Sequence, residues 1–114
     1  MGIEQRRHPR YRVCLEARVQ GFEMSTANLS VSGMQLVCPL MIYELIKKEL
    51  KANAVEVDLA LPGDQRVNTG FKALYIAECE DEMLIGSRFT RLNGGASTFS
   101  AYIDRLAESG ASMA

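Results

Sequence analysis

Residues 13–19 read VCLEARV, in which every second residue is apolar. A period of two places the apolar side chains on one face of an extended chain and the polar side chains on the other. The stretch therefore predicts a strand with one buried face. It decides the fold class, because the same kind of pattern returns along most of the remaining chain.

Further strands are predicted at 24–28, 34–37, 55–61, 67–77 and 83–92. The clearest is 55–61, VEVDLAL, and turn residues such as Pro62-Gly63-Asp64 separate neighbouring strands. Six short strands predict an all-β fold, a six-stranded antiparallel barrel, since closing the sheet removes the exposed edges that a short chain tolerates badly. In a barrel of this order we expect the first strand to lie beside the second and the third.

Two segments change from a period of two to helical spacing. Ile42, Leu45, Ile46 and Glu49 follow Pro39 at helical intervals, which predicts an extra helix at about 40–51. Its apolar stripe either packs against the barrel or forms a dimer interface. The second helix is the C-terminal one, which Ser97 can cap and which we expect to cover an open end of the sheet. Its apolar positions are Phe99, Tyr102, Ile103 and Leu106.

The length of 114 residues fits one domain. We expect a flexible arginine-rich arm at 1–12, the barrel with its C-terminal helix at 13–108, and a frayed tail at 109–114. No run approaches the roughly 20 apolar residues that span a bilayer, and no secretory signal is visible. The cysteines Cys14, Cys38 and Cys79 are odd in number and lack a CxxC spacing, which favours a reducing cytoplasm over disulfides or zinc.

The arm contains four arginines within residues 6–12, RRHPRYR. Residues 1–20 carry a charge of +3 and the remaining chain carries −4, so a positive arm precedes an acidic body. The guanidinium fork donates two parallel hydrogen bonds to a phosphate or to the edge of a guanine. The arm is therefore either a binding element for a planar anion or a solvated tail.

A second polar cluster lies at residues 28–33, NLSVSG, between two predicted strands. Asn and Ser side chains bond nearby backbone amides at such corners, and Gly33 is expected to supply a backbone conformation that other residues resist. The strand order places this cluster near the arm.

Together the two clusters resemble the PilZ domain, a family of bacterial receptors for the second messenger cyclic di-GMP. The family pattern RxxxR corresponds to residues 6–10, and [D/N]xSxxG corresponds to residues 28–33. Residues 86–89, GSRF, resemble the late strand of the family, and residues 99–106 its C-terminal helix. The resemblance implies a cytoplasmic adaptor without a cofactor that changes conformation when it binds cyclic di-GMP. It would act through a downstream protein partner on motility, exopolysaccharide and biofilm, or pili.

The resemblance also implies roles for six residues. Arg6 and Arg10 would bind guanine edges and phosphate, with Arg7 assisting, because guanine presents O6 and N7 as paired acceptors. The other guanine would meet the polar corner, where its contacts would be Asn28, Ser30 and Gly33. Gln5 stands where many relatives carry another arginine, which leaves open whether one ligand or a stacked pair binds.

Three other classes of function are alternatives to a cyclic di-GMP receptor. An enzyme is disfavoured, since His8 is the only histidine and no nucleophile–base pair or metal-ligand cluster is visible. A nucleic-acid-binding barrel with a basic arm is a second class, but the chain has no tryptophan and its body is acidic. A third class is a PilZ-like adaptor that binds no ligand. The sequence leaves a monomer and a homodimer open.

Overall fold

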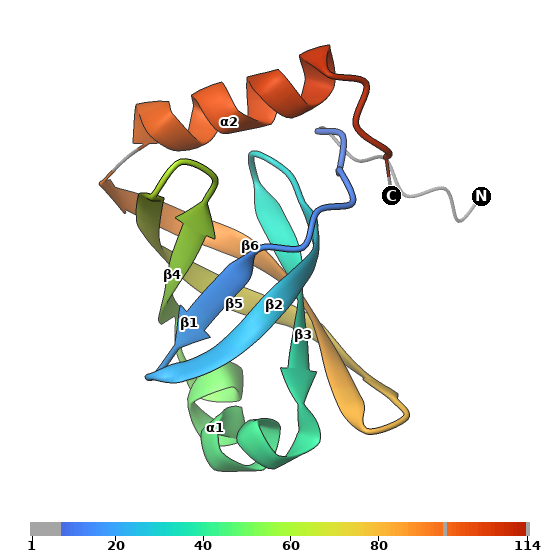
Figure 1. Cartoon of the computed structure of the whole chain (residues 1–114). Helices are drawn as coiled ribbons and strands as arrows, with labels where there is room; N and C mark the ends of the chain where they lie inside the picture. The colour runs from blue at the N-terminus through green and yellow to red at the C-terminus, as the bar shows by residue number, and fades with distance from the viewer. Residues whose placement is uncertain (1–7, 95, 114) are drawn as a thin grey trace, which may run out of the picture.

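Six antiparallel strands close into a barrel in the computed structural model, which describes residues 8–94 and 96–113 (Figure 1). The elements in chain order are β1 (Glu16–Val19), β2 (Phe22–Leu29), β3 (Gly33–Pro39), α1 (Leu40–Ala52), β4 (Val55–Leu61), β5 (Gln65–Cys79), β6 (Glu82–Gly94) and α2 (Ala96–Glu108). The predicted all-β barrel with two helices is confirmed.

The order of strands around the barrel is β1-β2-β3-β6-β5-β4, and β1 closes the ring by pairing with β4. The expectation that the first strand lies beside the third is therefore wrong. The long β5–β6 hairpin returns to β3, with Gly33 opposite Arg88, and thereby occupies the second edge of β3. The free edge of β1 is left for β4, where Ala17 lies opposite Leu59.

β1 begins three residues later than the sequence pattern predicts. Residues 13–15 are held instead by the side chain of Thr26 on β2, whose hydroxyl donates to the carbonyl of Val13 at 2.6 Å. The same hydroxyl accepts a hydrogen bond from the amide of Leu15 at 2.9 Å. The backbone amide of Thr26 also donates to the carbonyl of Leu15 at 2.9 Å, so backbone and side chain of one buried threonine together satisfy the backbone at the start of the barrel.

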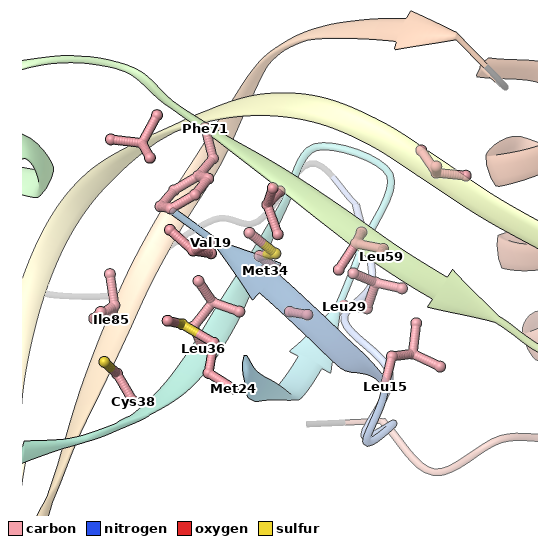
Figure 2. Close-up of a cluster of buried hydrophobic side chains, with 14 of the residues drawn as sticks. Leu15, Val19, Met24, Leu29, Met34, Leu36, Cys38, Leu59, Phe71 and Ile85 are labelled. Atoms are coloured by element: carbon pink, nitrogen blue, oxygen red, sulfur yellow. The ribbon is translucent and has the colours of Figure 1, made fainter. Parts of the chain in front are cut away.

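The core fills the barrel with the inward-facing residue of each alternating pair (Figure 2). Leu29, Met34, Leu36, Leu59, Phe71 and Ile85 have no exposed surface. α2 lies across one end of the barrel and α1 lies at the other (Figure 1). Phe99 of α2 is also fully buried, and its ring meets Phe89 of β6 edge-on with centroids 5.4 Å apart. Burying each such side chain contributes roughly 1.5–3 kcal/mol.

α1 packs against the barrel through Tyr43, Ile46 and Leu50. Leu45, expected on the packed stripe, is instead 67% exposed, next to Met41 on the opposite side of the helix. Pro39 precedes α1 and gives no side-chain cap. The amide of Leu40 donates instead to the carbonyl of Asp81 in the β5–β6 turn at 3.0 Å, so a tertiary contact satisfies the first turn of the helix.

The C-terminal segment, which its composition predicts to be a frayed tail, makes backbone contacts with the N-terminal segment. The amide of Arg12 donates to the carbonyl of Ser112 at 2.8 Å, and Met113 forms an antiparallel bridge with Tyr11. The segment is held because the N-terminal segment supplies backbone partners that are distant in sequence.

The three cysteines are free, and they should differ in reactivity. Burial raises the pKa of Cys38 to about 11, so its thiol stays protonated at neutral pH, whereas Cys14 and Cys79 are exposed. The thiolate is the nucleophile. We expect a maleimide to modify Cys14 and Cys79 rapidly in the native protein and Cys38 only after unfolding, as measured by peptide mass spectrometry. Modification of Cys38 at the rate of Cys79 would contradict this packing.

Candidate ligand-binding site

The N-terminal segment is attached to the barrel by one residue pair. The amide of Tyr11 donates to the carbonyl of Leu29 at 2.8 Å, and the amide of Leu29 donates back to the carbonyl of Tyr11 at 2.9 Å. Tyr11 is buried, so this pairing is shielded from water. Because the bridge is antiparallel, Arg10 and Asn28 are diagonal neighbours across it, and their side chains lie on the same face.

Arg10 and Asn28 are in direct contact, so one member of each predicted cluster meets the other. A guanidinium nitrogen of Arg10, Nη1, donates to the side-chain oxygen of Asn28 at 3.3 Å. The proximity of the arm and the corner was expected from β1 lying beside β3, and the structure achieves it through Tyr11 instead. Arg6 and Arg7 lie outside the described residues.

Asn28 begins a row of polar contacts that crosses the outer face of the barrel. Its amide nitrogen donates to the side-chain oxygen of Gln35 on β3 at 3.0 Å, and the amide nitrogen of Gln35 donates to the hydroxyl of Tyr75 on β5 at 3.1 Å. Between β3 and β5 lies Gly86 of β6, which is opposite both Gln35 and Tyr75. The row fixes the orientation of the Asn28 amide before any ligand arrives.

Two β-bulges turn the ends of this row outward. The register of β2 shifts between Thr26 and Asn28, and the register of β5 shifts between Ala73 and Tyr75. Strict alternation would have pointed Asn28 and Tyr75 toward the core, because a shift of one residue exchanges the two faces of a strand. A period of two through the predicted strand at 67–77 places Tyr75 on the face of Phe71 and Ala73. That expectation is wrong because of the bulge, and Tyr75 is 49% exposed.

The side chain of Ser30 makes its hydrogen bonds within the turn between β2 and β3. It is 1% exposed, and its hydroxyl oxygen accepts hydrogen bonds from the amides of Ser32 at 3.2 Å and Gly33 at 3.1 Å. The amide of Ser30 donates to the carbonyl of Gly33 at 2.9 Å, which closes the turn. Ser30 therefore sets the shape of the turn, and its direct contact with a ligand stays a prediction.

Gly33 is required by packing rather than by an unusual backbone conformation. Its φ is not positive, contrary to the expectation from sequence. A Cβ at this position would overlap the backbone oxygen of Ser87 on β6. The neighbouring Ser32 carbonyl accepts a hydrogen bond from the amide of Phe89 at 2.9 Å, so the turn is drawn tightly against β6. The close approach of β3 to β6 demands glycine.

The resulting site is a strand face with an arm along it, rather than a deep pocket. A cavity of about 240 Å³ lies on the other side of the arm, where His8, Pro9 and Tyr11 face α2. Within residues 8–94 and 96–113, no cluster of His, Cys, Asp or Glu is arranged to hold a metal ion. No helix in these ranges is long and apolar enough to span a membrane.

Gln35 and Tyr75 were missed by the sequence analysis. Gln35 lies between Met34 and Leu36, so a polar residue is expected there on the outward face of a half-buried strand. An ordinary solvated residue would give the same pattern, so the sequence did not mark Gln35 as part of a site. Tyr75 gave no signal, because the bulge that exposes it depends on its register with Gly86.

Gly33→Ala should destabilise the barrel by about 1–3 kcal/mol, because its methyl group would be forced against the backbone of β6. Gly86→Ala is the matched control, since the atoms nearest to a Cβ at Gly86 belong to the side chain of Tyr75, which can move, and not to backbone. Urea unfolding followed by circular dichroism measures both. Equal stability of the Gly33 variant and the unmodified protein would contradict the assigned role.

Comparison with known proteins shows the same fold in two regulators. The structure of the Bacillus subtilis inhibitor of motility (MotI/DgrA) superposes with a TM-score of 0.71 at 13% sequence identity, over 95% of this chain and 52% of that chain. MrkH, described as a cyclic di-GMP-dependent transcription regulatory factor, superposes with a TM-score of 0.68 at 13% identity, over 94% of this chain and 51% of that chain.

The chain thus spans about half the length of each of these two proteins. No protein-family model and no curated protein sequence matches it. At this level of identity the comparisons establish the fold alone. That fold is the PilZ-like barrel predicted from the sequence, in agreement with the resemblance carried by residues 6–10 and 28–33.

Proposed function

We propose that this chain is a receptor for cyclic di-GMP that binds the ligand between its arginine arm and the outer face of β2 and β3. The observation that carries the proposal is the Arg10–Asn28 contact, because it joins the two predicted ligand-binding clusters in one place. MrkH, which shares the fold, is by its description dependent on the same ligand.

The chemistry of the site suits a guanine nucleotide. The guanidinium of Arg10 can donate to the paired O6 and N7 acceptors of guanine. The amide of Asn28 bonds Arg10 and Gln35, and its second N–H and second lone pair would be left for the polar edge of a base. The ring of Tyr75 is half-exposed and lies over Gly86, which provides an aromatic surface on which a purine can stack. Arg6 and Arg7 would supply further cationic donors by the family resemblance.

The output we propose is regulation through a protein partner rather than catalysis. The two proteins of the same fold are described as an inhibitor of motility and a transcription regulatory factor. Motility, exopolysaccharide and biofilm, or pili in a bacterial cytoplasm are the processes that the resemblance implies. Binding would reposition the arm, which already contacts the C-terminal segment through Arg12 and Ser112.

Cyclic di-GMP should bind the purified protein in a way that depends on the arm. Arg6→Ala and Arg10→Ala should each cost about 1.5–3 kcal/mol, the scale of a hydrogen bond to a charged group. Isothermal titration calorimetry measures the affinities. Arg66→Ala is the control, since Arg66 is exposed at the far start of β5.

Parallel titrations with GTP and a short RNA separate the alternatives. Unchanged affinity in both arm variants would overturn the assignment of the site. Binding of RNA without binding of cyclic di-GMP would replace the receptor by a nucleic-acid-binding barrel.

Asn28 should control the choice between guanine and adenine. A site that hydrogen-bonds a base edge rejects analogues that leave its polar groups unpaired, so cyclic di-AMP should bind much more weakly than cyclic di-GMP. Asn28→Ala should narrow this difference, and Ser30→Ala should narrow it through the shape of the turn. Added salt should weaken both ligands by screening. Comparable affinities of the unmodified protein for the two cyclic dinucleotides would show that the corner does not read guanine.

A further inference from the structure

Two cations that have no salt-bridge partner within the described residues face each other on the outer side of the barrel. Arg88 on β6 lies directly opposite Lys72 on β5 in the antiparallel register, and both are exposed. Arg88 stands between buried Ser87 and Phe89 of the core, so alternation directs it outward. It therefore shares the face of Gly86, Gln35 and Tyr75.

This arrangement is unfavourable for the barrel alone. Like charges directly opposite each other across a strand pair destabilise a sheet. Within the described ranges, neither Lys72 nor Arg88 has a salt-bridge partner. The nearest carboxylate on the neighbouring strand β4 belongs to Glu56, which already has another interaction partner. The acidic residues of the β5–β6 tip begin six positions from Arg88, at Glu82, which is roughly 20 Å along an extended strand.

Arg88 also lies next to the turn that forms one side of the proposed site. It is opposite Gly33 on β3, which has no side chain to stand between the guanidinium and the turn. The amide of Phe89, the next residue, donates to the carbonyl of Ser32 at 2.9 Å and holds β6 against this turn. The turn itself is uncharged, since residues 28–33 read NLSVSG. β6 therefore places a cation where the turn has none.

We propose that Arg88, supported by Lys72, binds a phosphate of the cyclic dinucleotide that occupies the face of β2 and β3. This inference rests on the proposed function and extends it. The ligand has two phosphates, and the arm arginines would reach one from the β2 side. β6 is two strand spacings from β2, roughly 10 Å, so Arg88 approaches the ligand from the opposite side. A bound phosphate would offset the repulsion between Arg88 and Lys72. Ligand affinity would therefore depend on the charges of these two residues.

The test compares Arg88→Gln and Lys72→Gln with the unmodified full chain. Calorimetry at low and high salt measures cyclic di-GMP affinity, and thermal melting without ligand measures stability. Arg88→Gln should weaken binding about tenfold at low salt, and Lys72→Gln should have a smaller effect because it lies one strand further from the turn. Both variants should show a shallower salt dependence. Arg66→Gln and Lys48→Gln, at exposed cations away from the site, should bind as the unmodified protein does.

Arg88→Lys and the melting curves give two further readouts. Arg88→Lys should bind more tightly than Arg88→Gln but more weakly than the unmodified protein. Lysine keeps the positive charge but lacks the two parallel donors of the guanidinium. Without ligand, Arg88→Gln should melt at the same or a higher temperature at low salt, since a repulsion is removed. Binding by Arg88→Gln equal to that of the unmodified protein overturns this proposal while leaving the proposed function intact. Failure of the unmodified protein to bind cyclic di-GMP overturns both.

Discussion

The backbone pairing of Tyr11 with Leu29 is the constraint on which the candidate site depends. Two hydrogen bonds, shielded by the buried tyrosine, connect the N-terminal segment to the last residue of β2. Arg10 reaches Asn28 because its neighbour is fixed in this way. Tyr11 also forms a β-bridge with Met113, so the arm and the C-terminal segment are held by the same residue. A change in the position of the arm would therefore also move the C-terminal segment that follows α2.

The outer face of β2, β3, β6 and β5 acts as a platform because two bulges and two glycines shape it. The bulges direct Asn28 and Tyr75 outward at opposite ends of the polar row. The glycines serve different needs: Gly33 allows β3 to approach the backbone of β6, and Gly86 makes room for the Tyr75 ring. Bulges next to binding sites re-aim side chains in this manner, and here they do so without an exposed loop.

Charge is distributed unevenly along this face. Arg10, Arg88 and Lys72 gather near the β2–β3 turn, whereas Glu82 and its neighbours occupy the far tip of the β5–β6 hairpin. An anion approaching the barrel meets attraction at the turn and repulsion at the tip. Because exposed charges are screened beyond about 10 Å at 0.1 M salt, the two ends act largely independently. The separation would orient the proposed ligand, which carries two phosphates.

Sequence patterns were sufficient to predict the all-β class, the two helices and the pair of motifs at residues 6–10 and 28–33. The strands and the helices follow from local periodicity, which is a property of neighbouring residues, whereas the two motifs rest on residue identity and on the family resemblance. Residues 55–61, for example, form β4 with the predicted bounds.

How these parts meet depends on strand register and on pairings that become visible only in the folded barrel. A period of two predicts which residues share a face, but a single bulge reverses that assignment, as at Tyr75. The bulge is set by the register of β5 with Gly86 on β6, which the local pattern does not contain. The pairing of β1 with β4 and of Tyr11 with Leu29 depends in the same way on partners that no local pattern names. The alignment of Arg88 with Gly33 was likewise hidden, because residues 55 positions apart become neighbours only when the barrel closes.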